Sequence, residues 1–396
     1  METHEPSTQR PDFSLVLGGP LFQMYRRTHL SGDALELQRR RVLAITLFAW
    51  LPLLILSVLD GHAVGHGIKI PFFRDVEAHV RFLVALPALL IAELEVHTHI
   101  SPFIRQFLER GIVTPQDRPA YDAAVRSAVR ARNSVAIELL LLALVYTLGC
   151  WIWRSHAALH GATWYATPSA THLNLTRAGY WYAFISIPIF QFILLRWYMR
   201  LLVWFRFLWQ VSRLNLHLRA AHPDRAGGIG FLGAILYAFG PILFAQGALV
   251  AGMIASRVLY DGQSLLSFKS EALGYVVLFV FSILGPLCVF TPQLALTKRI
   301  GLAEYGLLAS QYVYGFESKW IQPATPEITD LLGTGDIQSL ADLGNSYGFV
   351  RQMRLVPFGL DDIGRLAAIT AAPLLPLLLT IWSVEELLVH VAKVIF

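Results

Sequence analysis

Long runs of apolar residues are the clearest pattern along the chain. Residues 42–59 form eighteen consecutive positions without a charged side chain, which is the length at which a membrane-spanning helix is expected. A shorter run at 366–382 contains Pro373 and Pro376, so it is expected to be either a short span or a re-entrant segment. Five further runs predict spans at 80–98, 134–153, 179–199, 229–255 and 272–296.

These runs predict helices rather than the strands of a barrel. Within lipid, every backbone N–H and C=O group must be paired inside a helix or within a closed barrel. Barrel strands would be about ten residues long with alternating polarity, and the sequence lacks that alternation. We therefore predict an all-α, polytopic helical membrane protein with six or seven transmembrane helices and cytoplasmic helical extensions.

The composition agrees with this class. Hydrophobic residues make up 55% of the chain and charged residues 15%, which is unusual for a soluble protein of this length. Cys150 and Cys288 both lie within predicted spans, so we expect small apolar core residues rather than a structural disulfide. The first forty residues lack an apolar run after a short basic start, and the sequence predicts no cleavable signal peptide.

Basic residues are distributed unequally between the loops. Most of the 32 Lys and Arg residues fall within segments 1–41, 99–133, 205–228 and 297–365, including Arg39 to Arg41 at the mouth of the first span. The opposite loops carry Lys69, Arg74, Arg154, Arg177, Arg257 and Lys269. The positive-inside rule then predicts a cytoplasmic amino terminus. The net charge of +5 follows from this distribution and does not indicate a nucleic-acid partner.

The prediction divides the chain into alternating membrane and cytoplasmic parts. These are a cytoplasmic amino-terminal segment 1–41, spans one and two in 42–98, a cytoplasmic helical hairpin 99–133, spans three and four in 134–204, a cytoplasmic loop 205–228, spans five and six in 229–296, a cytoplasmic helical region 297–365, and a final short span or re-entrant segment with an amphipathic tail in 366–396.

Local signals place helices within the cytoplasmic parts. Thr114 followed by Pro115 predicts that the second helix of the hairpin starts there, with threonine as the N-cap and proline in the first turn. Tyr305, Tyr312 and Phe316 recur at helical spacing, so the sixth span is expected to continue into water as an amphipathic helix.

Three stretches of the chain carry a resemblance to a known family. They are DFSLVLGGPL (Asp12 to Leu21), HPDRAGGIGFL (His222 to Leu232) and DIQSLADLGNSY (Asp336 to Tyr347). Together they resemble a family of predicted multi-span membrane proteins from Gram-negative bacteria, over nearly the whole chain. The resemblance implies a location in the bacterial inner membrane, and it carries over no activity and no site residues.

Charged residues at one depth of the bilayer form the first candidate site. Glu93, Glu138, Arg196 and Arg200 all fall near the cytoplasmic ends of their predicted spans. A lone charge at a helix centre costs roughly 2.5 to 3.5 kcal/mol, so such groups usually face inward and pair. We predict a buried polar network of these four side chains. In the alternative, the arginines extend to lipid phosphates while the carboxylates face water.

Two glycine–proline pairs form the second candidate site. Gly240-Pro241 and Gly285-Pro286 lie near the middle of the fifth and sixth spans. They combine little side-chain bulk with a missing backbone donor, which favours pathway-lining or hinge positions. The alternative is that they only kink the helices for packing.

The segment HPDRAGG forms the third candidate site. It places His222, Asp224 and Arg225 in the cytoplasmic loop before the fifth span. The glycines that follow favour a structured turn, and the alternative is an anion site formed by exposed N–H groups. A nucleotide loop is not favoured, because no lysine follows at the required spacing and no strand precedes the segment.

Histidines and carboxylates offer weaker metal candidates. His156 and His160 are four residues apart in an outer loop, a spacing that brings two imidazoles to one helical face. The run from Glu93 to His99 resembles a four-ligand site, but helical geometry places its two Glu-His pairs on nearly opposite faces.

These observations lead to three functional hypotheses. The sequence lacks a nucleotide loop, a GxSxG motif, a Cys-His pair and a complete metal site, so an enzyme is not favoured and no cofactor is predicted. The favoured hypothesis is a membrane conduit, either a channel or a transporter, for an ion or small solute. Its expected partners are the lipid bilayer and further copies of the same chain in a homo-oligomer. The alternative is a membrane scaffold or sensor that acts through its cytoplasmic helices. A metal-dependent membrane enzyme ranks third. A continuous polar path would favour transport, whereas tightly packed apolar spans would favour the scaffold.

Overall fold

The computed structural model describes residues 14–16, 18, 23, 37–64, 68–149, 163–168, 173–322 and 334–380. Most of these residues are helical, which confirms the predicted helical class. The helices are α2 (Gln38–Leu59), α3 (Val76–His79), α4 (Leu86–Glu109), α5 (Arg118–Arg132), α6 (Val135–Leu144), α8 (Arg177–Trp181), α9 (Ile187–Val211), α10 (Phe231–Ile235), α11 (Gly240–Tyr260), α12 (Lys269–Leu284), α13 (Thr291–Trp320), α15 (Asp336–Gln352) and α16 (Leu360–Ala371). Strands β1 (Ala166–Pro168) and β2 (Leu173–Leu175) pair in an antiparallel ribbon.

Several described helices have the dimensions of membrane spans. Five continuous stretches are long and apolar enough to cross a bilayer, and a sixth is added if α5 and α6, which bend by 44° at their junction, count as one span. The segment 366–382 falls partly in one of these stretches, Leu360–Thr380. The chain therefore has the helices of a membrane-embedded protein, while the number of crossings, their orientation and the identity of the membrane stay predictions.

The prolines of the predicted spans occur where the helix changes type. Pro87 and Pro188 each lie two residues after the end of a π-helical segment, Val80–Ala85 and Tyr182–Ser186 respectively. Pro241 follows one 3-10 segment and Pro286 lies within another. A proline removes one helical donor and its ring crowds the preceding turn, so a local change in hydrogen-bond spacing accommodates it. Pro52 instead lies within α2.

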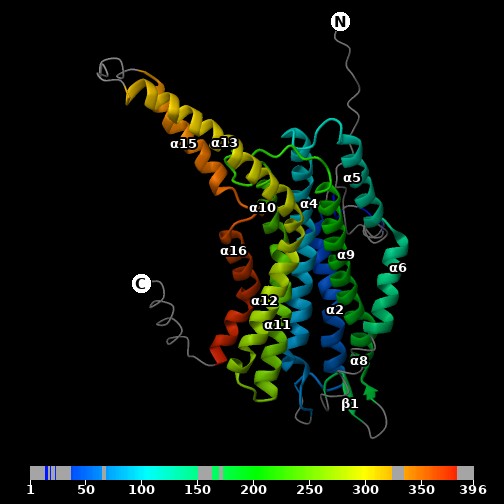
Figure 1. The fold of residues 1–396 in the computed structure, drawn as a ribbon. Helices are drawn as coiled ribbons and strands as arrows, with labels where there is room; N and C mark the ends of the chain where they lie inside the picture. Colours follow the sequence, from blue (N-terminus) through cyan, green and yellow to red (C-terminus); the bar gives the residue numbers. More distant parts are fainter. Residues whose placement is uncertain are drawn as a thin grey trace.

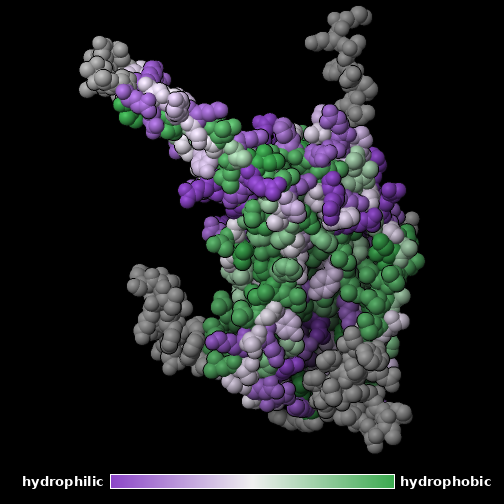
Figure 2. Space-filling model, viewed as in Figure 1, coloured by the Kyte–Doolittle hydropathy of each residue, from purple (hydrophilic) through white to green (hydrophobic). Residues whose placement is uncertain are grey.

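The helices form one bundle with an arm at one end. In the bundle, α9 packs against α4, α5 and α6, while α11 packs against α4, α12 and α16. Helices α13 and α15 pack on each other and project away from the end opposite the β1–β2 ribbon (Figure 1). On the face shown in Figure 2, an apolar band separates two hydrophilic ends, which is the surface pattern expected of a protein surrounded by lipid.

The helical hairpin at 99–133 starts its second helix later than predicted. Helix α4 continues to Glu109, and Gly111 follows with a φ of 64°. The N–H of Asp117 donates to the hydroxyl of Thr114 over 3.3 Å, so these residues form a turn. Helix α5 begins at Arg118 with Pro119 in its first turn. The predicted N-cap at Thr114 was wrong, because its side chain closes this turn instead of capping the helix.

Candidate functional site

The structure brings the four predicted intramembrane charges together and adds a fifth. Glu93 comes from α4, and Arg196 and Arg200 lie one turn apart on α9. Glu138 lies in the first turn of α6, which begins after the capping side chain of Ser134. The fifth member is Arg41, in the first turn of α2. Four helices therefore contribute to this charge network.

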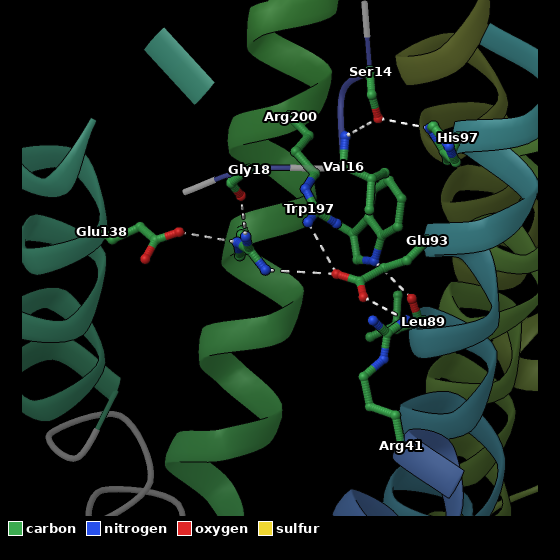
Figure 3. A network of polar contacts seen from close by, with 11 residues as sticks. Ser14, Val16, Gly18, Arg41, Leu89, Glu93, His97, Glu138, Trp197 and Arg200 are labelled. Carbon is green, nitrogen blue, oxygen red and sulfur yellow. Dashed lines mark hydrogen bonds and ion pairs between the residues drawn. The ribbon is translucent and has the colours of Figure 1, made fainter. Parts of the chain in front are cut away.

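The carboxylate of Glu93 is the centre of the charge network (Figure 3). Its Oε2 lies 2.9 Å from Nη2 of Arg41, and its Oε1 lies 2.9 Å from Nη2 of Arg200. Nη1 of Arg196 lies 3.6 Å from the same Oε1, and its Nε lies 3.3 Å from Oε1 of Glu138. Arg196 therefore lies between two carboxylates, and it approaches both less closely than its neighbours approach Glu93.

All five side chains are buried. Relative exposures are 1% for Arg41, 4% for Glu93, 3% for Arg196 and Arg200, and 7% for Glu138. Burying charges is unfavourable unless they are paired and hydrogen-bonded, so these groups are held in place by one another. The alternative in which the arginines reach lipid phosphates does not describe this arrangement.

A short amino-terminal segment covers the charge network. Ser14, Leu15 and Val16 are each at most 2% exposed. The hydroxyl of Ser14 lies 2.9 Å from Nδ1 of His97 on α4, and its carbonyl accepts a hydrogen bond from Arg132. The carbonyl of Gly18 accepts from Nη2 of Arg196 over 3.5 Å (Figure 3).

Gly18 has a conformation and a packing that only glycine fits. Its φ is 134°, and a Cβ built on it would lie 2.4 Å from Oδ1 of Asn133 and 2.6 Å from Nη2 of Arg132. L-residues rarely adopt this φ, and the close contacts leave no space for a side chain. The chain can therefore pass directly over the arginines at this point.

Positive charge is not fully balanced at the edge of the charge network. Arg132 is 9% exposed and forms no ion pair with a carboxylate among the described residues. Burial, followed by the charge of Arg196, lowers the pKa of Arg132. Nη1 of Arg196 is buried without a hydrogen-bond partner in the described part of the chain. Two guanidinium groups thus keep donor capacity in a buried setting, which suits an anionic group.

Sequence reasoning missed three parts of this site. Arg41 was grouped with the basic cluster at the membrane surface, and the register of α2 turns it inward. The amino-terminal cover was missed because its contacts lie far away in the sequence. Trp197 is fully buried, its indole N–H donates to the carbonyl of Leu89 over 2.9 Å, and Arg200 lies over its ring. Of these three parts, only Arg41 had a signal in the sequence, namely a helical register that turns its side chain inward.

The glycine–proline pairs flank a cleft rather than line it. A cleft of about 230 Å³ lies between α9, α11 and α12, and its polar members include Tyr198, Gln246 and Ser282. Pro241 precedes the α11 residues of this cleft, and Gly285 follows those of α12. The amide of Gln246 donates to the hydroxyl of Tyr198 over 2.8 Å. Whether these pairs act as hinges stays a prediction.

The HPDRAGG loop is a structured turn built around Asp224. Its carboxylate accepts hydrogen bonds from the N–H groups of Ala226, Gly228 and Gly230 at 2.8 to 3.1 Å. Arg225, Gly227 and Gly228 all have positive φ. These three N–H groups already have a carboxylate partner, so the arrangement does not favour the alternative of an anion site.

Two further contacts fix this loop. Burial acts to raise the pKa of Asp224, but the three N–H groups hold it below its usual range. His222 lies 2.9 Å from the same carboxylate. The guanidinium of Arg354 donates to the carbonyl of Asp224 over 3.1 Å, which ties the loop to the segment after α15.

We expect Asp224→Ala to lower the free energy of unfolding by about 1 to 3 kcal/mol, because it leaves buried N–H donors unpaired. The folded-state pKa of Asp224 lies below its usual 3.8, so its contribution is complete above that value and is lost as the pH falls through the folded-state pKa. Thermal unfolding in detergent at several pH values measures this. Asp342→Ala, at an exposed aspartate, should change little, and equal losses in both variants would contradict the assignment.

The predicted metal ligands gain no further support. His156 and His160 lie outside the described residues. Within the described ranges, no group of three or more His, Cys, Asp or Glu side chains is placed to hold a metal ion. In the run after Glu93, His99 pairs with Glu95 over 3.5 Å at the surface, while Glu93 faces the charge network. The pairs Glu93–His97 and Glu95–His99 therefore do not form one four-ligand site, as helical geometry predicts.

Comparisons of the chain with protein-family models, curated proteins and solved structures find no match. The resemblance to a Gram-negative membrane protein family therefore stays a prediction.

Proposed function

We propose that this protein is a membrane conduit for a small ion or solute, and that a small anion is the class that fits. The observation that carries the proposal is the buried charge network, in which Glu93, Glu138 and three arginines from four helices meet inside the bundle. Ionisable groups within membrane helices are costly and often mark ion or substrate pathways.

The preference for an anion rests on Arg196 and Arg132. Arg196 approaches its two carboxylates at 3.3 and 3.6 Å, distances at which a hydrogen bond is weak or absent. Arg132 contacts the carbonyl of Ser14 and the side chain of Asn133. An anion that replaced these weaker contacts would form charge-assisted hydrogen bonds with both arginines. A cation would be repelled, because guanidinium groups dominate the site.

Buried residues lie on two sides of the charge network. The amino-terminal segment Ser14–Val16 covers one side. On the other side, buried apolar residues separate it from a second polar cluster, in which Arg81 donates to Tyr182 over 2.6 Å and pairs with Glu77. The rings of Phe82 and Phe190 pack edge to face within this layer. Transport would therefore require one of these closures to move.

Reconstitution in liposomes tests this proposal. Purified protein in proteoliposomes should carry a potential-driven current for at least one member of a panel of chloride, nitrate, phosphate and small carboxylates. Potassium and sodium should pass less readily, because the arginines disfavour cations. Currents that never exceed those of protein-free liposomes for any member of the panel would contradict the proposal.

A scaffold or sensor is the second candidate function, and the arm favours it. Helices α13 and α15 form a hairpin that extends beyond the bundle (Figure 1), and Asp336 accepts hydrogen bonds from Lys319 and Trp320 across it. The bundle core is also tightly packed and largely apolar. Absence of transport together with a bound partner protein on the arm would favour this function.

A further inference from the structure

The cleft between α9, α11 and α12 lies on the side of α9 that faces away from the charge network. Tyr198 lines this cleft, and it is two residues from both Arg196 and Arg200 along α9. At about 100° per residue, it therefore points to nearly the opposite side of the helix from these two arginines. The cleft and the charge network are separate features of the bundle.

The cleft has a buried floor and an open rim. Ile242, Leu243 and Ile283 line the floor and are at most 3% exposed. At the rim, Leu278 is 55% exposed and Tyr198 is 36% exposed. All three helices belong to stretches that are long and apolar enough to cross a membrane, so the rim faces hydrocarbon rather than water. A ligand would therefore reach this cleft from the bilayer.

The polar groups of the cleft leave one hydrogen-bond donor without an acceptor. Gln246 is 4% exposed, and its amide nitrogen donates to the hydroxyl of Tyr198 over 2.8 Å. The hydroxyl is thus the acceptor in this bond, and the described residues supply no acceptor for its own proton. The hydroxyl of Ser282 already donates to the carbonyl of Leu278 over 2.8 Å. An unpaired donor is unfavourable away from water, so a ligand that offers an acceptor to Tyr198 is favoured.

The size of the cleft fits a single ring. An apolar cavity of about 150 Å³ is large enough to bind benzene. The cleft has a volume of about 230 Å³, which accommodates one substituted ring but not the paired acyl chains of a phospholipid. Phe279 and Tyr198 place aromatic side chains in its lining, and aromatic side chains pack well against a flat ring. The open rim leaves space for an apolar tail in the surrounding lipid.

We propose that this cleft binds the head ring of a membrane-dissolved quinone, with a ring carbonyl that accepts the hydroxyl proton of Tyr198. A quinone combines the features that the cleft requires, namely one flat ring, an acceptor that carries no proton of its own, and an apolar tail. The proposal concerns binding alone and assigns no electron transfer to the protein. It is independent of the proposed conduit, because the cleft and the charge network lie on opposite sides of α9.

Binding of decylubiquinone to the purified full-length protein in nanodiscs tests the proposal. The wild type should bind it saturably and about tenfold more tightly than decylbenzene, which has the same tail but cannot accept a hydrogen bond. Tyr198→Phe keeps the ring and removes the donor, so this preference should disappear. Tyr146→Phe is the matched control, because Tyr146 is an exposed tyrosine whose hydroxyl donates to the carbonyl of Phe184 outside the cleft. This control should retain wild-type affinity.

A second variant tests the location without removing a hydrogen bond. Leu278→Trp enlarges an exposed side chain at the rim, so it should close the cleft and abolish saturable binding while the buried floor stays intact. Dioleoylglycerol, which carries ester carbonyls on two acyl chains, should not compete with decylubiquinone. Equal affinities of the wild type and Tyr198→Phe for decylubiquinone would overturn the proposal, and so would binding that Leu278→Trp leaves unchanged. Competition by dioleoylglycerol would assign the cleft to an acyl ester lipid instead.

Discussion

Glu93→Gln is expected to lower the free energy of unfolding by about 3 to 5 kcal/mol, because it leaves buried arginines without their shared carboxylate. Glu93 contacts Arg41 and Arg200 at 2.9 Å, and Arg196 at 3.6 Å. The amide oxygen of glutamine can still accept a hydrogen bond, but it cannot balance their charge. Thermal or denaturant unfolding in detergent measures the loss.

A double-mutant cycle separates this network effect from a general loss of packing. Combining Glu93→Gln with Arg200→Gln should cost less than the sum of the single changes, because the two residues interact directly. The exposed pair Lys69 and Asp261, 3.4 Å apart, is the control, and its coupling should be below about 1 kcal/mol. Strictly additive losses at Glu93 and Arg200 would contradict the network described for them.

Gly247→Val is the second change with a large expected effect. A Cβ at Gly247 would lie 1.9 Å from the backbone oxygen of Thr370, where α11 meets α16. Backbone atoms cannot move aside as a flexible side chain can, so the substitution should destabilise the protein by about 3 kcal/mol or more. Loss of the α11–α16 contact should also make the segment 360–380 more accessible to protease.

Gly240→Ala is the matched control for Gly247. A Cβ there would meet only Cδ1 of Ile369 at 3.6 Å, an ordinary contact, so the loss should stay below about 1 kcal/mol. If Gly247→Val and Gly240→Ala lower the melting temperature equally, then α16 does not pack on α11 as described. The comparison also bears on the segment 366–382, which the sequence predicts to be either a short span or a re-entrant segment.

Much of the helical organisation follows from the sequence, because apolar runs and charge positions reflect the bilayer directly. The positions of Glu93, Glu138, Arg196 and Arg200 along their helices indicated a common depth. Their depth was enough to suggest that they meet, since few other partners exist for a charge inside a membrane. Four of the predicted spans, 42–59, 179–199, 229–255 and 272–296, coincide with stretches that are long and apolar enough to cross a membrane. The predicted span 134–153 overlaps such a stretch only if α5 and α6 count as one span, and the predicted span 80–98 is not among these stretches.

Other features depend on contacts that the local sequence does not encode. Ser14 and Gly18 contact residues on three distant helices, and no spacing rule links such positions. Helix α5 starts later than predicted, because the side chain of Thr114 closes a turn before the helix. Such a turn and a helix N-cap use the same residue types, so the sequence does not distinguish them.

The proposed conduit requires the charge network to contact the solute, so anion flux should depend on the charge at Arg196. Arg196→Gln in proteoliposomes should reduce flux at least tenfold, and Arg196→Lys should retain part of it, because the charge remains. Arg206→Gln, at an exposed arginine of α9 that contacts Ser127, should leave flux unchanged. Folded Arg196→Gln protein with wild-type flux and selectivity would contradict the account.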